Sequence, residues 1–564
     1  MRTLHIMLPL ITGSASLLAA QSGRTHVPQP TSAAISAADL RTRLYIIADD
    51  SMEGRDSGHR GSARAAAYIA GETQRLGLTP GGENGTFFQA IPLRVRRPDS
   101  SSFLRVGDRR LVFGTDFIPY PRTATQTFLG GQPFGGSFDA TGIASIFGGR
   151  IGDSVYVDPA SAAGKAVLFA APRQEDAGAL QRFYSRGIPA RYASAALIGF
   201  VRPDGLPAGL RVPRDAYDDP SHPWNPQLTV AALSPDALMA ILGKPPEQLT
   251  IGEAGHAISG RFGFLDAPTE VPAQNIVAIL PGSDPTLRAQ YVALGAHYDH
   301  VGILPYALDH DSVRIANAVI RPRGGDDPRR EATAQEARII QARLDSVRRT
   351  HPVRLDSINN GADDDGSGSA LMLELAESFA KSGRRPKRSL LFVWHTAEEK
   401  GLYGAQYFSD HPTVPRDSIV AQINMDQMGR GEPEDNPPGG RNALVVIGSR
   451  RLSTELGDMV ERQNAASHSF RLDYEFDRPD DPNLAYCRSD HYMYARYGIP
   501  VVFFVAAAWY RDYHMVSDEP QYIAYDRMAN IGRFIRTFVA DVADLNHRPV
   551  VDKPKPDPYG ACTP

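Results

Sequence analysis

The chain has 564 residues, more than one hydrophobic core normally supports, so we expect at least two domains. Its 42% hydrophobic and 22% charged residues are typical of an ordinary soluble protein. The formal net charge is −4 and the basic residues are dispersed, so no nucleic-acid partner is expected. After the first twenty residues no stretch reaches the roughly 18 apolar residues of a membrane span, and we expect no stable span.

The N-terminus has the features of an export signal. A weakly basic start is followed by a largely apolar stretch to Leu18 and by a cleavage point at Ala19-Ala20. We predict a signal peptide over residues 1–20 and an exported protein, periplasmic or secreted; a retained N-terminal anchor is the alternative. Residues 21–35, rich in Ser, Thr, Pro and Gln, are predicted to be a flexible tether.

Two helices are predicted next in the chain. Ser36 can cap a helix with apolar residues at helical spacing, and a second helix is expected over residues 62–76. Residues 36–122 are therefore assigned to the N-terminal part of a compact unit that resumes later.

The composition changes over residues 123–260, where Gly, Ala and Pro are abundant. Short β-like runs at 166–170 and 196–201 alternate with turns, and 235–242 has the pattern of a short helix. No cluster of titratable residues indicates chemistry here. We expect an inserted β-rich domain that serves as a spacer or lid.

Residues 265–545 alternate between apolar runs of the buried-strand type and helical segments. The runs are 276–280, 291–294, 390–394, 419–423 and 501–505, and the clearest helices are 369–380 and 527–545. This alternation predicts an α/β fold, an α/β/α sandwich around a mostly parallel sheet. Ligands of such sheets bind at the carboxyl ends of the strands, where His297, Glu399 and Asp426 fall.

A polar insertion at residues 302–360 interrupts this unit. Its centre, 329–349, has apolar residues at helical spacing among many charges, which predicts an amphipathic helix. This helix could be a lid or an oligomer contact, or a solvated helix without a special role. Residues 546–564 are assigned as a C-terminal tail, and the sequence leaves the oligomeric state open.

The chain contains two cysteines, Cys487 and Cys562, which excludes a disulfide-dense scaffold and a Cys-rich zinc site. In an oxidising compartment they could pair and fix the tail near Tyr486. Two free thiols are the alternative.

Residues of metal-ligand type accumulate in the second half of the chain. They are two histidines and three acids: His297, Asp364, Glu399, Asp426 and His514. Two neutral imidazoles and three carboxylates can hold a pair of divalent cations if one carboxylate bridges them. Such a pair can activate a water molecule and stabilise a developing oxyanion. The combination indicates a co-catalytic hydrolase, although no single residue would do so.

The neighbours of these residues fit that chemistry. Asp299 is placed to fix the tautomer of His297, while His300 is either a competing ligand or a structural histidine. Glu398 and Glu399 can divide the work between metal binding and general-base catalysis. The chain has no His-Glu-x-x-His or Gly-x-Ser-x-Gly motif, and metal-activated water remains as the mechanism.

Together these segments resemble the M28 family of zinc aminopeptidases. The motifs His-x-Asp, Asp-Asp-x-x-Ser-Gly, Glu-Glu-x-Gly, Asn-x-Asp and a late Tyr-His occur in the family's order within residues 275–545. The N-terminal helices are similar to those of bacterial members, and residues 123–260 resemble a protease-associated (PA) domain. The resemblance implies a zinc-peptidase type of α/β fold, two Zn²⁺ ions per chain and a peptide substrate.

The resemblance also implies how the ligands are divided. The family spacing Asp-x-x-Ser-Gly selects Asp364 from three adjacent acids as the bridging ligand. His297 and Asp426 then complete one zinc site, and Glu399 and His514 complete the other.

Further roles are implied for the surrounding residues. Glu398 matches the general base, Asp299 the hydrogen-bond partner of His297, and Tyr486 a tyrosine that supports the oxyanion in some members. The resemblance assigns no role to Asp518, which follows His514 closely.

We therefore predict an exported di-zinc metallopeptidase that removes N-terminal residues from peptides. Alternatives on the same fold are carboxypeptidase action, which an arginine from 302–360 in the pocket would favour, and aminoacyl cyclisation. A non-catalytic, receptor-like ectodomain is the alternative from another class.

Overall fold

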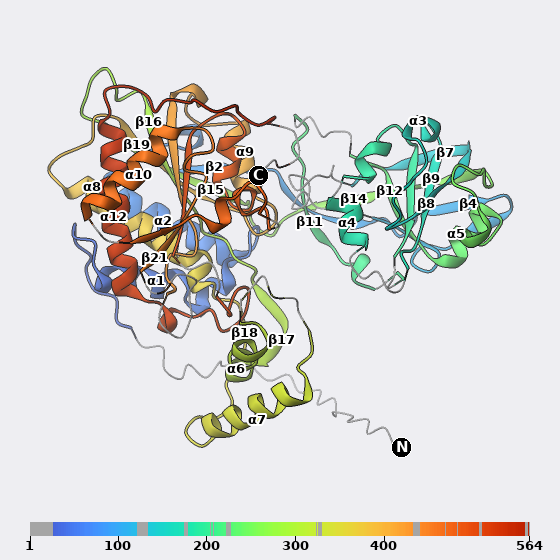
Figure 1. Ribbon diagram of the computed structural model, residues 1–564, viewed down its shortest axis with the longest axis horizontal. Helices are drawn as coiled ribbons and strands as arrows, with labels where there is room; N and C mark the ends of the chain where they lie inside the picture. The colour runs from blue at the N-terminus through green and yellow to red at the C-terminus, as the bar shows by residue number, and fades with distance from the viewer. Residues whose placement is uncertain are drawn as a thin grey trace.

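The computed structural model describes residues 26–120, 134–173, 179–185, 187–202, 205–206, 208–221, 227–322, 324, 327, 330–431, 440, 442–467, 470–481, 483–506, 510–558 and 562. The predicted signal peptide lies outside these residues. Figure 1 shows three parts: a sheet covered by helices, a separate β-rich unit, and a small arm that contains α6 (His310–Ile320) and α7 (Ala334–Arg348).

A mixed sheet forms the centre of the first part, and nine of its strands lie in the described residues. Their order is β1-β15-β19-β16-β20-β23-β21-β22, with β2 paired to β15. The bounds are β1 Thr79–Pro80, β2 Phe88–Ala90, β15 Gln274–Leu280, β16 Tyr291–His297, β19 Ser389–His395, β20 Ile419–Met425, β21 Ala443–Ile447, β22 Arg471–Asp473 and β23 Val501–Val505. The central strands β19, β16, β20 and β23 are parallel, while β15 and β21 join them antiparallel.

Helices cover both faces of this sheet (Figure 1). One face packs against α1 (Ala37–Ile47), α2 (Arg60–Arg75), α8 (Gly368–Lys381), α10 (Thr454–Ser467) and α12 (Tyr525–Asp544); the other packs against α9 (Tyr403–Asp410) and α11 (His491–Ala495). Side chains alternate along β19, where Phe392 and Trp394 face the first layer and Val393 faces the second. The predicted α/β/α sandwich is confirmed.

Buried charges hold the N-terminal helices on this core. Ser36 caps α1 by accepting a hydrogen bond from the backbone of Asp39, as expected. Arg43 of α1 is fully buried and its Nε donates to Glu374 of α8 at 2.9 Å. The described part of the expected tether, residues 26–35, is anchored at the same place, because the Thr31 hydroxyl donates to Glu377 at 2.6 Å.

The β-rich unit consists of three sheets, ordered β6-β12-β10-β9-β8, β5-β4-β13-β7 and β11-β3-β14. Strands β4 and β6 pair with the later strands β13 and β12, so the unit begins before the expected residue 123. Its bounds are β3 Leu93–Pro98, β4 Phe103–Val106, β5 Arg109–Leu111, β6 Phe117–Pro119, β7 Phe138–Ile143, β8 Ser145–Arg150, α3 Pro159–Ala162, β9 Ala166–Ala170, α4 Ala179–Ser185, β10 Leu197–Val201, β11 Arg214–Tyr217, β12 Val230–Leu233, α5 Pro235–Leu242, β13 Ile258–Phe262 and β14 Phe264–Pro268.

The ribbon β11-β3-β14 joins this unit to the body, the part built on the nine-stranded sheet. The ring of Tyr217 on β11 stacks on Tyr403 of α9, with centroids 4.9 Å apart. Lys400, which directly follows Glu399, pairs with Asp215 of β11. The β-rich unit therefore contacts the loop that carries two of the predicted site residues.

The insertion forms the arm below the body in Figure 1. Strands β17 (Ile303–Asp309) and β18 (Leu355–Ile358) pair antiparallel, and the predicted helix is α7, with a capping box between Thr333 and Glu336. The guanidinium of Arg314, in α6 of the arm, lies 3.6 Å from the centroid of the Tyr522 ring of the body, and this contact attaches the arm to the body. Over the described residues, no helix has the length and apolarity to cross a bilayer.

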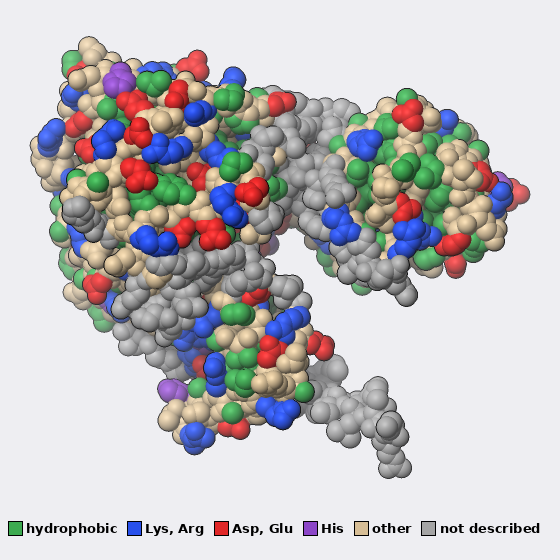
Figure 2. All heavy atoms as spheres, viewed as in Figure 1, with side chains coloured by type: hydrophobic (Ala, Val, Ile, Leu, Met, Phe, Trp, Pro, Cys, Tyr) green, Lys and Arg blue, Asp and Glu red, His purple; other side chains and the backbone are tan. Residues whose placement is uncertain are grey.

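The C-terminal tail is attached to the body by a disulfide between Cys487 and Cys562. The structure thus decides between the paired and free cysteines that the sequence left open. On the face shown in Figure 2, basic and acidic side chains of the described residues are interspersed.

Candidate metal centre

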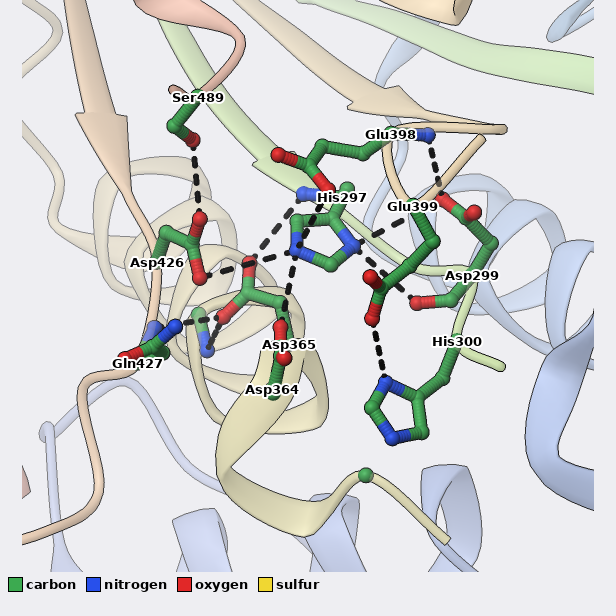
Figure 3. A network of polar contacts seen from close by, with 12 residues as sticks. His297, Asp299, His300, Asp364, Asp365, Glu398, Glu399, Asp426, Gln427 and Ser489 are labelled. Carbon is green, nitrogen blue, oxygen red and sulfur yellow. Dashed lines mark hydrogen bonds and ion pairs between the residues drawn. The ribbon is translucent and has the colours of Figure 1, made fainter. Parts of the chain in front are cut away.

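The five expected ligands meet at the carboxyl edge of the parallel strands, and Figure 3 shows four of them, His297, Asp364, Glu399 and Asp426. His297 ends β16, Asp426 follows β20, and Glu399 lies on the loop after β19. Asp364 lies in the turn before α8, and His514 in the segment after β23. His514 has φ +55°, a left-handed conformation that costs a non-glycine residue about 1–3 kcal/mol and that occurs mainly at functional sites.

Asp364 lies between the two histidines. Its Oδ1 is 3.2 Å from His297 Nε2, and its Oδ2 is 3.0 Å from His514 Nε2. His297 Nε2 is also 3.7 Å from Asp426 Oδ1, while His514 Nε2 is 2.8 Å from Glu399 Oε2. The Asp364 carboxylate therefore faces one histidine of each expected metal site, as two bridged cations require.

Unsatisfied atoms in the site fit a bound metal. His297 Nε2, Asp364 Oδ2, Asp426 Oδ1 and His514 Nε2 are buried and make no hydrogen bond to the described residues. Most buried polar atoms in proteins do have such a partner. Imidazole nitrogens and carboxylate oxygens in this arrangement are a donor set that zinc accepts.

The site also has an excess of negative charge. Burial raises the pKa of Glu398 well above its usual value, and Glu399 and Asp426 contribute to the shift. Burial alone would lower the pKa of His514, but Glu399 and Asp364 outweigh it and raise this pKa to about 10. A divalent cation would relieve the repulsion among these carboxylates.

The three adjacent acids have different partners. Asp365 accepts hydrogen bonds from the backbone N–H groups of His297 and Gln427 at 3.2 and 3.1 Å. Asp363 accepts from the backbone N–H of Gly429 at 2.6 Å. Of the three carboxylates, that of Asp364 faces both His297 and His514.

The neighbouring residues orient the ligands. The His297 Nδ1–H donates to the carbonyl of Asp299 at 3.1 Å, which leaves Nε2 facing the carboxylates. The Asp299 carboxylate accepts from the backbone N–H of Glu398 at 3.1 Å. His300 Nδ1 donates to Glu399 Oε1 at 2.7 Å, so the other oxygen of Glu399 is the one that faces His514.

His300 also belongs to a possible ligand group. Its ligand atom lies within 4.8 Å of those of Asp364, Glu399 and His514. Both interpretations of His300 in the sequence therefore have a geometric basis.

The sequence did not assign two residues that hold the ligands. The Ser489 hydroxyl donates to Asp426 Oδ2 at 2.9 Å, and Ser489 lies directly before the acid of the Ser-Asp-His run. Asp518 accepts from the backbone N–H groups of Asp363 and Asp364 at 3.0 and 3.1 Å and pairs with buried Arg430. The only sequence signal for Asp518 was its proximity to His514.

A pocket opens beside the expected ligands, and Asp364, Glu398 and Asp426 are among its lining residues. Its other described lining residues are mostly apolar or aromatic and include one arginine: Gln427, Val445, Ile447, Phe476, Asn483, Ala485, Arg488, Ser489, Phe503, Val505, Tyr510 and Tyr513. The described lining residues include none from the 302–360 insertion.

Tyr486 lies apart from this pocket. Its ring is buried, 5.7 Å from the His491 ring and 5.6 Å from the Tyr492 ring. Tyr513 lines the pocket instead and stacks on His514 at a centroid distance of 3.8 Å. Burial raises the pKa of Tyr513 well above its usual value, so its hydroxyl stays protonated and able to donate.

Comparison with known proteins connects this site to a family. Residues 325–539 match the model of peptidase family M28. Leucine aminopeptidase 1 of Coccidioides posadasii is 28% identical over 215 residues, 36% of this chain and 52% of that protein. Leupeptin-inactivating enzyme 1 of Streptomyces exfoliatus is 39% identical over 82 residues, 14% of this chain and 19% of that protein.

The chain thus spans 19% and 52% of the length of these two relatives. Among solved structures, the zinc aminopeptidase BSAP of Bacillus subtilis aligns with a TM-score of 0.45 at 14% identity. The alignment covers 93% of this chain and 99% of that one.

Proposed function

Because the chain belongs to peptidase family M28, we propose that it is an exported zinc aminopeptidase with two metal ions that share Asp364. The observation that carries this proposal is the position of Asp364, whose two oxygens face His297 and His514 at 3.2 and 3.0 Å. His297 and Asp426 would complete one ion's ligands, and Glu399 and His514 the other's. Bound zinc would polarise the scissile carbonyl and lower the pKa of a water molecule.

Glu398 is proposed as the general base. It lines the pocket beside Asp364, and its backbone is held by the hydrogen bond to Asp299. Its carboxylate would accept a proton from the attacking water and deliver it to the leaving amine. We place the oxyanion-stabilising hydroxyl on Tyr513 in preference to Tyr486, because Tyr513 lines the pocket next to a ligand.

The pocket supports selectivity for an apolar N-terminal residue. Val445, Ile447, Phe476, Phe503 and Val505 are among its lining residues. Burial of an apolar side chain against such a wall is favourable by about 1.5–3 kcal/mol. The similarity to a protein named leucine aminopeptidase agrees with this selectivity.

A second candidate is carboxypeptidase action, which one observation favours. Arg488 lines the same pocket and could hold a substrate carboxylate. This arginine comes from the segment before α11 and not from the insertion.

Two further proposals concern the rest of the chain. The disulfide between Cys487 and Cys562 supports export, because disulfides persist in oxidising compartments. We also propose that the β-rich unit is a PA-like domain. Its Asp215 pairs with Lys400, so the unit contacts the loop that carries Glu398 and Glu399.

A substrate panel tests the proposed function. Peptides with a free amine and the same peptides with a blocked amine are assayed with and without a chelator. We expect cleavage of free-amine peptides, preferably with an apolar first residue, and loss of cleavage with the chelator. Cleavage of blocked but not free-amine peptides would reject the aminopeptidase and favour the carboxypeptidase. Chelator-resistant cleavage would reject the metal mechanism.

A further inference from the structure

Arg55 is a buried arginine beside the metal centre. It ends the short helical segment Asp50–Arg55 and lies outside residues 325–539, which match the family model. Its exposure is 0%, and its backbone is left-handed, with φ +52°. Burial of a guanidinium is costly unless its donors are satisfied, so the contacts of this side chain indicate what it is for.

All of its hydrogen bonds go to backbone carbonyls. Nε donates to Tyr298 at 2.7 Å, and the two terminal nitrogens donate to Ile47 at 3.0 Å, Asn360 at 2.5 Å and Gly361 at 2.8 Å. Tyr298 directly follows the ligand His297, and Gly361 begins the turn that carries Asp364. One planar guanidinium therefore connects the end of β16 to the bridging-ligand turn.

The surrounding charges fit this position. Burial lowers the pKa of Arg55, and the opposing influences come from Asp518, Asp299, Asp365 and Asp364. Asp518 holds the same turn from the other side, because it accepts from its backbone N–H groups. Arg55 thus binds carbonyl groups of the turn, and Asp518 binds its backbone N–H groups.

We propose that Arg55 is a positioning residue that sets the spacing between His297 and Asp364, so that one carboxylate serves both metal sites. The proposal rests on the metal centre of the proposed function. The fork geometry matters here, since a lysine cannot bond the same carbonyls in one plane. The N-terminal segment is on this account part of the metal centre.

Arg388 provides a matched control. It is also 0% exposed, and it donates to the backbone carbonyls of Leu545 and His547, away from the metal centre. Its loss should lower stability by leaving buried carbonyls without donors but should not change metal binding.

The test compares zinc binding by the full chain and by the variants R55A, R55K and R388A. Zinc affinity is measured by competition with a chelator, and stability by thermal unfolding. We expect R55A to bind zinc about 10- to 100-fold more weakly, the usual range for loss of a residue that supports metal ligands, with R55K in between. R388A should unfold at a lower temperature and bind zinc as the wild type does. Guanidinium at low, non-denaturing concentration should partly restore the zinc affinity of R55A.

Wild-type zinc affinity in R55A, together with a loss of stability like that of R388A, would overturn the inference. If R55A does not fold, R55K decides, and undiminished zinc affinity in R55K would likewise overturn it. A wild-type chain that binds no zinc would instead overturn the proposed function on which the inference rests.

Discussion

Two sheets in the described part of the chain contain several adjacent parallel strands, and one of them gathers residue types that can catalyse a reaction. In the peptidase body, the carboxyl ends of the strands lead to His297, Glu398 and Asp426, which are buried or nearly so. In the β-rich unit, β8, β9 and β10 are also parallel, but β8 ends at Arg150 and Arg173 follows β9. Both edges are formed by the carboxyl ends of parallel strands, but one carries a histidine and acids and the other carries arginines.

The difference lies in how the charges are satisfied. Arg150 pairs with Glu247 at 2.7 Å, and Arg173 pairs with Asp153 at 2.6 Å, with Glu247 and Arg173 largely solvent-exposed. At the other edge, buried carboxylates lie close to one another and to two imidazoles. His297 Nε2, Asp426 Oδ1 and His514 Nε2 there make no hydrogen bond to any residue that the structure describes. The carboxyl ends of parallel strands are a suitable position for a binding site. Whether catalysis is possible there depends on the residues at that position.

The largest expected effect separates the two edges directly. E398Q keeps the size of the side chain but removes the proposed proton acceptor, so kcat should fall about 10²- to 10⁴-fold. Bound zinc should remain. The matched change at the other edge, E247Q, should leave kcat within about twofold, because exposed ion pairs contribute little. Near-normal turnover in E398Q would remove Glu398 from the mechanism.

The disulfide is expected to have the next largest effect, and it lies beside the pocket at the catalytic edge. Cys487 precedes Arg488 and Ser489, which line the pocket, and it is joined to Cys562 across a separation of 75 residues. Loss of a cross-link of this length should lower the free energy of unfolding by about 2–4 kcal/mol. Denaturant unfolding of C562S measures this, with reductant added as a control that should not destabilise C562S further. An unchanged free energy of unfolding would show that the tail adds no stability.

A pH-dependent effect is expected where the arm meets the body. Burial, and secondarily Arg354, lowers the pKa of His310 to about 4. The folded state thus favours neutral His310. The contribution of His310 to the free energy of unfolding is complete above pH 6.5 and is lost as the pH falls from 6.5 to 4. The loss should be at most about 3 kcal/mol of unfolding free energy.

Unfolding measurements at pH 7 and pH 4 check this contribution. The decrease on acidification should be smaller in H310N than in the wild type by that amount. The exposed His351 provides the control, and H351N should behave as the wild type does. An equal decrease in H310N and wild type would contradict the assignment.

The smallest effect is expected at the arginine edge. R150A and R173A remove charges that are paired at the surface, and kcat and KM should each change by less than about twofold. A tenfold loss of activity in either variant would give the β-rich unit a part in catalysis and remove the contrast between the two edges.

Sequence reasoning located most of the body because its buried strands are continuous apolar runs. The strand 501–505 of the body was predicted with the bounds that the structure has, as were the strand 166–170 and the helix 235–242 of the β-rich unit. Strands β17 and β18 and helix α6 were missed, since the arm is polar and only partly buried and its pattern is weak. Strands β4 to β6 were missed because they are short, and β4 and β5 also contain arginines.

The candidate site was likewise predictable only in part. The ligand types were visible in the sequence, but family spacing was needed to select Asp364, whereas the structure distinguishes it by the backbone partners of Asp363 and Asp365. Arg55 and Asp518 act on backbone groups of distant segments, and no local pattern marks such residues.

Anomalous diffraction from crystals of the zinc-loaded protein, measured at the zinc edge, tests the central claim most directly. The account predicts two peaks, one beside His297 and Asp426 and one beside Glu399 and His514, each next to a different oxygen of Asp364. A single peak, or two peaks that do not share Asp364, would contradict it.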